Sequence, residues 1–482
     1  MTPSEAPPAS LSDWRLGDRF ERIDGRQFLT GNQALVKLPM LQRELDRRAG
    51  LNTAGFISGY RGSPLGNLDT ALLAQNRRLH EDGIRFSPAV NEELAATAVW
   101  GSQQANQLPF RARYDGVFAM WYGKGPGVDR AGDAIKHGNY AGASRHGGVL
   151  VLAGDDHGGK SSTLVYQSDH ALQSFVMPVL HPASVRDYFK VGLFGWALSR
   201  ATGLWAGFKC VTDIVESTVG FDFDLGRVRF VSGDLVVPTR FRDPAPMMLQ
   251  ALEEEGLFVH RLPAALDFAR ANPIDEIITA TSRGGLGVIA VGKAYGDLMQ
   301  ALQQLGLDQT SLAALGIGIY KIQLAWPIEP IQLRRFASGC RELLVIEEKR
   351  AFVEPQVANE LFNSGADRPL LSGKRSHDGR LLFPEQGELS PAMIRTVLVD
   401  RLDRLGRLTD ELRQAHTGLS RREGAALAMV LGSSALRSCR PARSSFATAS
   451  TCAPASGASV VTAARRSRAA CPTKVQIGRA HV

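Results

Sequence analysis

Cysteine is scarce in this chain: there are 5 among 482 residues, and no two of them form a CxxC pair. So few cysteines cannot cross-link a fold of this size, and they provide no paired thiolates for a metal or a cluster. The sequence also has no run of 18 apolar residues, which excludes a membrane-spanning helix, and no apolar signal core near its start. We therefore expect a protein of the reducing cytoplasm with no membrane partner.

Acidic residues are absent from the end of the chain. Glu423 is the last one, and the eight Lys and Arg residues that follow it carry the whole formal net charge of +8. The rest of the chain is neutral, which argues against nucleic acid as its partner. Residues 424–482 are rich in Ala, Ser and Arg and can bury little apolar surface. They are either a basic disordered tail, which could itself bind nucleic acid, or coding sequence read out of frame, and we favour the second interpretation.

Buried strands that alternate with helices make up most of the remaining sequence. Apolar runs bounded by glycine or proline recur between segments whose apolar residues have helical spacing. This alternation predicts an α/β fold: a doubly wound domain with its ligand site at the carboxyl ends of parallel strands, followed by a smaller α/β domain. The expected strands lie in residues 55–60, 116–123, 147–154, 176–182 and 208–215 of the first domain, and in 285–295, 317–328 and 343–349 of the second.

The same pattern predicts where one region of the chain gives way to the next. The expected regions are an N-terminal extension (1–24), the doubly wound domain (25–220), a connector (221–280), the smaller α/β domain (281–365), a linker or the start of a further region (366–423) and the aberrant basic tail (424–482).

One stretch fits the phosphate-loop pattern. Gly154–Ser161 follows an apolar run and reads G-x-x-x-x-G-K-S. A phosphate loop binds its ligand through backbone N–H groups, and the carboxylates of Asp155 and Asp156 would repel that anion. A nucleotide-binding protein that uses Gly154–Ser161 is therefore the alternative function. The preferred interpretation is an ordinary strand-to-helix loop in which the Asp residues cap the helix.

Three further motifs lie where strands are expected to end or helices to begin. They are the turn 59–64 (GYRGSP), the helix start 91–98 (NEELAATA) and the glycine-rich turn 123–129 (GKGPGVD). Taken singly, each has an ordinary structural explanation, because tight turns need glycine and acids in a first helical turn complement the helix dipole. The histidines have no metal-ligand spacing, and His157, His170 and His181 are expected to be structural.

The order and spacing of these motifs together resemble one family. The strand into GYRGSP, the NEEL helix start, GKGPGVD and VLVLAGDDHGGKSS, followed by a second α/β unit, resemble the 2-oxoacid:ferredoxin oxidoreductases. The segment LTGNQALVKLPMLQRE at 29–44 makes the chain most similar to the long, fused indolepyruvate:ferredoxin oxidoreductases of bacteria. The resemblance covers residues 25–420, approximately.

This resemblance implies an enzyme that oxidatively decarboxylates aryl 2-oxoacids, such as indolepyruvate, to acyl-CoA. Thiamine diphosphate would be its cofactor, and iron–sulfur clusters would pass the electrons to ferredoxin. Residues 25–220 would form the pyrimidine-binding type of thiamine diphosphate domain, and 281–365 a transketolase C-terminal-like domain. The implied partners are the 2-oxoacid, coenzyme A and ferredoxin, and a homodimer is expected.

The resemblance also implies roles for individual residues. Glu92 is the expected catalytic carboxylate, which would hydrogen-bond N1′ of the cofactor's aminopyrimidine and so make that ring an internal base. Glu93 is the second choice for this role. The other cofactor-binding residues that the resemblance implies are Gly59, Tyr60, Lys124, Gly125 and Asp129, and Arg61, Gly62 and Ser63 would lie on the substrate side.

The chain departs from the family pattern after residue 423. The fused enzymes continue into a domain that binds the diphosphate and Mg²⁺ and then into a further catalytic domain, and neither is recognisable here. Cys439, Cys452 and Cys471 do not reproduce a CxxC pair, and no ligands for a 4Fe–4S cluster are seen. No metal site is assigned, because Mg²⁺ and the clusters would be held by the missing regions. We therefore expect the polypeptide alone to be inactive.

Overall fold

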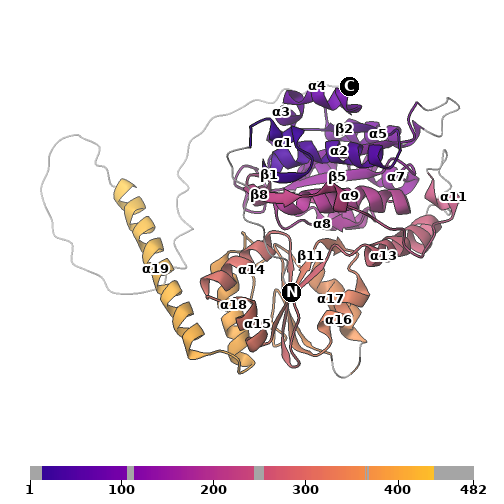
Figure 1. Ribbon diagram of the computed structural model, residues 1–482. Helices are drawn as coiled ribbons and strands as arrows, with labels where there is room; N and C mark the ends of the chain where they lie inside the picture. The colour runs from indigo at the N-terminus through magenta and orange to yellow at the C-terminus, as the bar shows by residue number, and fades with distance from the viewer. Residues whose placement is uncertain (1–13, 106–112, 244–253, 364, 366–367, 439–482) are drawn as a thin grey trace, which may run out of the picture. The chain divides into compact units, whose positions relative to one another are not determined.

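Figure 1 shows the computed structural model of the chain, which describes residues 14–105, 113–243, 254–363, 365 and 368–438. The chain divides into two compact units, Met1–Arg422 and Glu423–Val482. The described part of the second unit is the end of helix α19 (Asp410–Ser438). The remainder of the expected aberrant tail, with its three cysteines, lies outside the described residues. The architecture below is therefore that of the first unit.

A seven-stranded sheet forms the first half of this unit. Its order is β12-β6-β7-β5-β4-β2-β3, and all neighbours are parallel except β12, which pairs antiparallel with β6. Strands β5 and β7 are buried along their whole length because helices cover both faces of the sheet. The strands span Ala54–Gly59 (β2), Ile84–Phe86 (β3), Val117–Lys124 (β4), Val149–Asp155 (β5), Val179–Leu180 (β6), Ala206–Val211 (β7) and Leu324–Trp326 (β12).

Two groups of helices cover this sheet. Residues of α2, α3, α4 and α9 share one apolar core with the strands, and residues of α5 to α8 share another (Figure 1). Helix α2 shows how the sequence sets this packing, because Thr30 and Gln33 form a capping box at its start and apolar residues recur along its buried face. The helices span Asp18–Glu21 (α1), Gly31–Arg48 (α2), Gly66–Ala74 (α3), Asn76–Glu81 (α4), Glu92–Gln103 (α5), Gly125–Arg130 (α6), Gly132–Ala141 (α7), Asp169–Ser174 (α8), Val185–Thr202 (α9) and Thr212–Val215 (α10).

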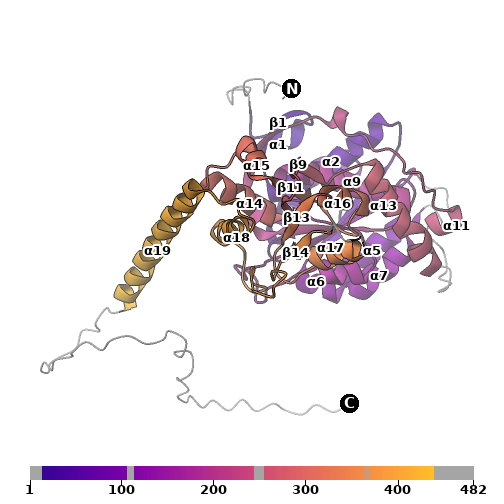
Figure 2. The ribbon, with the colours of Figure 1, turned by 90° about the horizontal axis from the view of Figure 1, so that it is seen from below.

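A smaller five-stranded sheet forms the second half, with the order β14-β13-β10-β11-β9. Strand β9 is antiparallel to its neighbour, and the others are parallel. Helices α14, α15 and α18 lie on one side of it and α16 and α17 on the other (Figure 2). The elements span Glu276–Thr279 (β9), Gly285–Val291 (β10), Lys293–Gln304 (α14), Gln309–Leu315 (α15), Ile317–Ile322 (β11), Pro330–Ala337 (α16), Cys340–Ile346 (β13), Val353–Phe362 (α17), Leu370–Ser372 (β14) and Pro391–Arg404 (α18).

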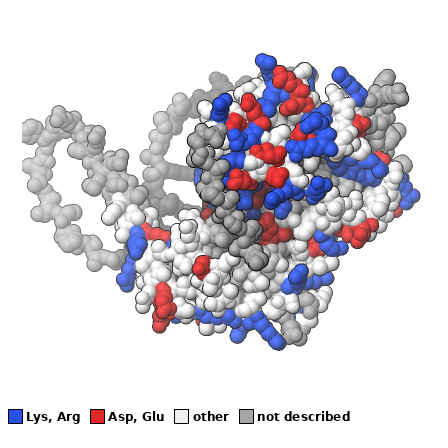
Figure 3. Space-filling view, viewed as in Figure 1, with Lys and Arg blue, Asp and Glu red and all other residues white. Residues whose placement is uncertain are grey.

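The connector between the sheets is folded against the first one. Strand β1 pairs antiparallel with β8 in a two-stranded ribbon, and α13 packs on α9. The elements are Gly25–Thr30 (β1), Thr218–Phe223 (β8), Leu225–Arg227 (η3), Thr239–Arg242 (α11), Gly256–Arg261 (η4) and Leu262–Ala271 (α13). Figure 3 shows one face of the half that contains the seven-stranded sheet. Acidic and basic side chains are interspersed on this face, without a broad region of one sign.

The predicted doubly wound α/β fold with a second α/β sheet is confirmed. One predicted strand is divided, since the segment 317–328 supplies β11 to the second sheet and β12 to the first. The division occurs at Gln323, whose backbone oxygen accepts a hydrogen bond from the His181 N–H at 2.7 Å. The carboxylate of Asp275 also binds the chain between β11 and β12, because it accepts hydrogen bonds from the backbone N–H groups of Gln323 and Leu324 at 2.6 and 2.9 Å. The two sheets are therefore joined by hydrogen bonds, which apolar periodicity does not reveal.

Candidate active site

Three loops meet at the carboxyl edge of the first sheet. They follow β2, β4 and β5, which are neighbours in the sheet and end at Gly59, Lys124 and Asp155. The Tyr60 N–H donates to the carbonyl oxygen of Tyr122 at 3.1 Å, so the first loop starts against β4. A Cβ atom on Gly62 would lie 2.7 Å from Cδ of Lys124. The turn with Arg61, Gly62 and Ser63, expected on the substrate side, thus touches the glycine-rich turn 123–129, which is expected to bind the cofactor.

The loop after β5 completes this edge. The hydroxyl groups of Ser63 and Ser161 are hydrogen-bonded to each other, and the Ser162 hydroxyl donates to the carbonyl oxygen of Ser63 at 3.4 Å. Gly125 faces the ring of Tyr166, since a Cβ atom there would lie 2.1 Å from Cδ1 of that ring. Glycine is therefore required at position 125 by the close approach of a side chain.

Glu92 is the first residue of α5, and the carboxyl ends of β2 and β4 lie beside this helix. The side chain of Asn91 caps the helix by accepting from the Leu94 N–H at 2.8 Å. The indole N–H of Trp121, in β4, donates to the backbone oxygen of Glu92 at 3.0 Å. The Glu92 residue is only 5% exposed, whereas Glu93 points to solvent. Of the two acids in this turn, Glu92 is the one that lies inside the protein.

The carboxylate of Glu92 has few partners. Among the described residues, the charged group that pairs with it is the Arg130 guanidinium, at 3.8 Å between Oε2 and Nε, which is too long for a hydrogen bond. On its other side lies Gly127, where a Cβ atom would be 2.7 Å from Cγ of Glu92 and 2.9 Å from Oε1. A buried carboxylate without a strong protein partner can accept a hydrogen bond from a ligand.

The remaining predicted residues lie near this edge without entering the core. Asp129 lies on the exposed side of α6, and its pKa is raised by partial burial and by the negative charge of Asp155. Arg61 is exposed at the tip of the first turn, and Lys124 is half-buried. The loops bring together Gly59, Tyr60, Gly62, Ser63, Lys124 and Gly125, and α6 places Asp129 beside them.

The phosphate-loop interpretation is not supported by the structure. The Asp156 carboxylate accepts from the backbone N–H groups of Lys160, Ser161 and Ser162 at 3.0, 2.7 and 3.0 Å, so it takes the place that a phosphate would need. Burial opposes its ionisation, but these N–H groups outweigh burial and lower the pKa of Asp156. The Lys160 ammonium is engaged by Asp213 at 2.6 Å. No helix begins until α8, at Asp169.

Comparison with known proteins identifies the relatives of this chain. Residues 276–426 match the family model described as the indolepyruvate oxidoreductase domain. This part of the chain is similar to the indolepyruvate oxidoreductases. The indolepyruvate oxidoreductase subunit IorA of Methanothermobacter marburgensis is 24% identical over 373 residues, which cover 77% of this chain and 54% of that protein. IorA of Pyrococcus abyssi is 24% identical over 362 residues, or 72% of this chain and 49% of that protein. The chain thus spans about half the length of these relatives.

A solved structure has a similar fold. The 2-oxoglutarate:ferredoxin oxidoreductase from Magnetococcus marinus, solved with 2-oxoglutarate, coenzyme A and succinyl-CoA bound, superposes with a TM-score of 0.57 at 15% sequence identity. The match covers 78% of this chain and 65% of that one. At this identity the likeness establishes the fold, and it agrees with the sheet order described above.

A cluster of buried charges, which the sequence motifs do not include, lies behind the loops of the first sheet. The Lys209 ammonium, in β7, contacts the carboxylates of Asp155, at 3.2 Å, and Asp169. Burial opposes its charge, but Asp169 and Asp155 outweigh burial and raise the pKa of Lys209. The Ser168 N–H donates to Asp155 at 2.7 Å, which fixes the start of α8. A lysine inside an apolar strand was the signal that could have revealed this cluster.

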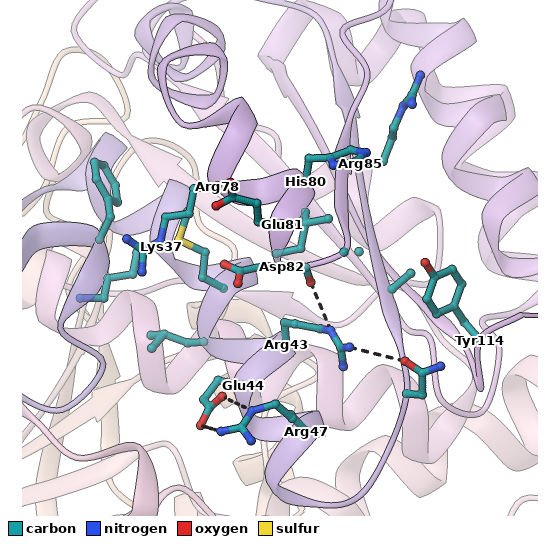
Figure 4. Close-up of a pocket in the computed structure, with 18 of the residues that line it drawn as sticks. Lys37, Arg43, Glu44, Arg47, Arg78, His80, Glu81, Asp82, Arg85 and Tyr114 are labelled. Carbon is teal, nitrogen blue, oxygen red and sulfur yellow. Dashed lines mark hydrogen bonds and ion pairs between the residues drawn. The ribbon is translucent and has the colours of Figure 1, made fainter. Parts of the chain in front are cut away.

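A cavity of about 750 Å³ opens at the other end of the first sheet (Figure 4). It is lined by the starts of β2 and β3 and by side chains of α2 and α4. Two of its arginines form contacts within the fold: Arg43 donates to the backbone oxygen of Asp82 at 3.2 Å, and Arg47 pairs with Glu44 at 2.7 Å. Because none of the predicted site residues lines it, we do not assign it to the active site.

Among the residues that the structure describes, no group of three or more His, Cys, Asp and Glu side chains is arranged to hold a metal ion. Within the same described part, no helix is both long enough and apolar enough to cross a membrane.

Proposed function

We propose that this chain is part of a 2-oxoacid:ferredoxin oxidoreductase that decarboxylates aryl 2-oxoacids, such as indolepyruvate, with thiamine diphosphate. The observation that carries the proposal is the buried Glu92 carboxylate, which faces Gly127 and has no hydrogen bond from its nearest cation. The match of residues 276–426 to the indolepyruvate oxidoreductase domain supports the substrate class, and the shared α/β fold supports the type of enzyme.

The residues at the carboxyl edge fit this cofactor. When bound, thiamine diphosphate supplies the electron sink that takes up the electron pair of the broken carbon–carbon bond. Glu92 would accept a hydrogen bond from the aminopyrimidine at N1′ and hold a proton there, and its burial would strengthen that bond. Glycine at position 127 leaves this carboxylate uncovered, and Gly59, Tyr60, Lys124, Gly125 and Asp129 would form the walls around the cofactor.

The substrate would approach from the turn after β2. Arg61 is exposed and can attract the carboxylate of a 2-oxoacid, and the Ser63 hydroxyl can donate to it after leaving Ser161. The proposal includes coenzyme A as acyl acceptor and ferredoxin as electron acceptor, a homodimer and a cytoplasmic location. It assigns Mg²⁺ and 4Fe–4S clusters to regions of the enzyme other than this chain, and the isolated chain is proposed to be inactive.

Calorimetric titration of the purified chain tests the proposal. Thiamine diphosphate should bind saturably through its aminopyrimidine ring, without a requirement for Mg²⁺, and Mg-ATP should not bind. Because the separate chain is proposed to be inactive, binding is the appropriate readout. Tight binding of ATP that is lost in Lys160→Met would instead favour the nucleotide-binding alternative.

A further inference from the structure

Lys349 is a buried lysine in an unusual backbone conformation. It lies just after β13, at the carboxyl edge of the second sheet, and has a φ of +57°. Residues other than glycine, asparagine and aspartate rarely adopt this left-handed conformation, and those that do often lie at functional sites. The Lys349 residue is 6% exposed, yet within the described part of the chain its ammonium has no hydrogen bond or ion pair. A largely buried side chain whose ammonium forms no ion pair can offer its charge to an anionic ligand.

Two buried histidines near Lys349 also lack partners. His157 follows β5 and His181 follows β6, and the residues are 2% and 5% exposed. Among the described residues, none forms a hydrogen bond with either ring nitrogen of His157 or with Nε2 of His181. Burial lowers the pKa of His157 well below its ordinary value, and the nearby charges of Lys209, His181, Lys349 and Lys293 lower it further. Both imidazoles are therefore neutral near pH 7, and each has an N–H that can donate.

The two sheets bring these groups together. His181 lies against the start of α14, since a Cβ atom on Gly292 would be 2.1 Å from its Nε2. The loop after β5 touches the segment before α18, where Lys160 pairs with Glu388 at 3.0 Å. His157 and Lys349 thus lie where the carboxyl edges of the two sheets meet.

The acids around Lys349 are already engaged. Asp156, Glu348 and Glu388 are the carboxylates that act on its charge. Asp156 accepts from three backbone N–H groups, Glu388 pairs with Lys160, and Glu348 pairs with Lys293 at 3.1 Å. Two of these three acids thus have their own cation, and backbone N–H groups bind the third.

We propose that Lys349, His157 and His181 form a subsite for a small anionic group, a carboxylate or a phosphate, between the two sheets. The ammonium would supply the charge, and the neutral imidazoles would donate hydrogen bonds to the anion's oxygens. Two sources share this chemistry: the carboxylate of a 2-oxoacid and a phosphate of a nucleotide-type cosubstrate. The subsite does not depend on the proposed role of Glu92 or on thiamine diphosphate.

The test compares Lys349→Met with Lys374→Met in the full chain. Lys374 is a matched control because it is also 6% exposed, but its ammonium donates to the backbone oxygen of Glu347 at 2.6 Å. Calorimetric titrations use inorganic phosphate, phenylpyruvate and 3′,5′-ADP as separate probes. At least one should bind the wild type, and its affinity should fall about tenfold to hundredfold in Lys349→Met and stay unchanged in folded Lys374→Met. If the wild type binds phenylpyruvate more tightly, the anionic group that the subsite takes is a carboxylate. If it binds phosphate and 3′,5′-ADP more tightly, that group is a phosphate.

The subsite is overturned if none of the three probes binds the wild type, or if Lys349→Met binds them equally well. A measurement on the wild type alone covers the case in which the variant does not fold. Acylation of Lys349, followed by peptide mass spectrometry, should slow at least about tenfold when the binding probe saturates the protein. An unchanged rate contradicts the proposal. Glu92→Gln should keep the wild-type affinity for the probe, so loss of thiamine diphosphate binding and loss of the subsite can be told apart.

Discussion

Glu92 and Gly127 are in direct contact, and there is no room for a side chain between them. A methyl group at position 127 would lie 2.7 Å from Cγ of Glu92 and 2.9 Å from Oε1, closer than carbon and oxygen atoms approach without a bond. The side chain of Glu92, in the first turn of α5, therefore needs a residue without a side chain at position 127 of α6. The glycine-rich turn is needed at this point to keep a carboxylate uncovered.

Gly127→Ala should displace the Glu92 side chain. We expect a loss of roughly 1–3 kcal/mol in the free energy of unfolding, because the added methyl group overpacks a buried contact. We also expect thiamine diphosphate affinity to fall at least about tenfold as the carboxylate moves. Urea unfolding and calorimetry measure the two effects separately.

Gly101→Ala is the matched control for this substitution. Gly101 lies in the same helix as Glu92, and a Cβ atom there would meet nothing within 4 Å. The change should therefore raise stability by roughly 0.5–1 kcal/mol through helix propensity and leave cofactor affinity unchanged. Equal effects of the two substitutions on affinity would contradict the assigned contact.

The ion pair of Asp46 and Arg200 should be a major element of stability in the first half. Both carboxylate oxygens of Asp46 bind the guanidinium, at 2.5 and 2.8 Å, and the Thr53 hydroxyl donates to the same carboxylate at 2.6 Å. Asp46→Asn would leave a largely buried guanidinium without its counter-charge, and we expect a loss of roughly 3 kcal/mol. The exposed pair of Arg77 and Glu81 supplies the control, because Glu81→Gln should not change the urea midpoint measurably.

The stability of the second half should depend on the protonation of Glu347. Burial raises the pKa of Glu347 to about 7 from 4.5, although the N–H groups of Val353 and Glu354 oppose this. The folded state therefore keeps a proton that the unfolded state has lost, and this contribution to stability is complete below pH 4.5. It declines as the pH rises and is gone above pH 7, approximately.

Glu347→Gln isolates this contribution. The free energy of unfolding of the wild type, relative to the variant, should decrease by roughly 3 kcal/mol between pH 4.5 and pH 8. Urea titrations at several pH values measure the difference. Parallel curves for the two proteins would show that Glu347 titrates equally in both states.

Asp156 should order the loop that resembles a phosphate loop. Asp156→Ala removes the acceptor of three backbone N–H groups, so amide exchange at Lys160, Ser161 and Ser162 should accelerate at least about tenfold. Asp133→Ala, at an exposed position of α7, is the control and should leave these amides unchanged. If both variants exchange alike, the loop is ordered by other contacts.

The sequence was sufficient for the central buried strands of the two sheets, but the edge strand β3 of the first sheet was not predicted. Apolar runs bounded by glycine mark β2, β4, β5, β7 and β10 because buried parallel strands need apolar residues on both faces. The position of β12 could not be predicted, because the backbone N–H groups of Gln323 and Leu324 donate to the carboxylate of Asp275, about 50 residues earlier in the chain, and apolar periodicity does not reveal this contact.

The candidate site was predictable only in part. The order of the motifs indicated Glu92 and the glycine-rich turns as candidate site residues. The structure brings these turns together at the carboxyl edge of the first sheet. Lys349 could not be found in this way, because its backbone conformation and its lack of partners arise from packing between the two sheets. Resemblance to a family identifies residues that lie in the family's motifs. A buried charged side chain without an ion pair, in contrast, can be recognised only in the three-dimensional structure.

The affinity of Glu92→Gln for thiamine diphosphate tests the central claim most directly. Glu93→Gln is the control, since Glu93 is the adjacent acid in the same helical turn and is exposed. We predict saturable binding to the wild type and to Glu93→Gln, and binding weakened at least about tenfold in Glu92→Gln, with or without Mg²⁺. Equal binding by the wild type and Glu92→Gln, or a loss confined to Glu93→Gln, would contradict that claim.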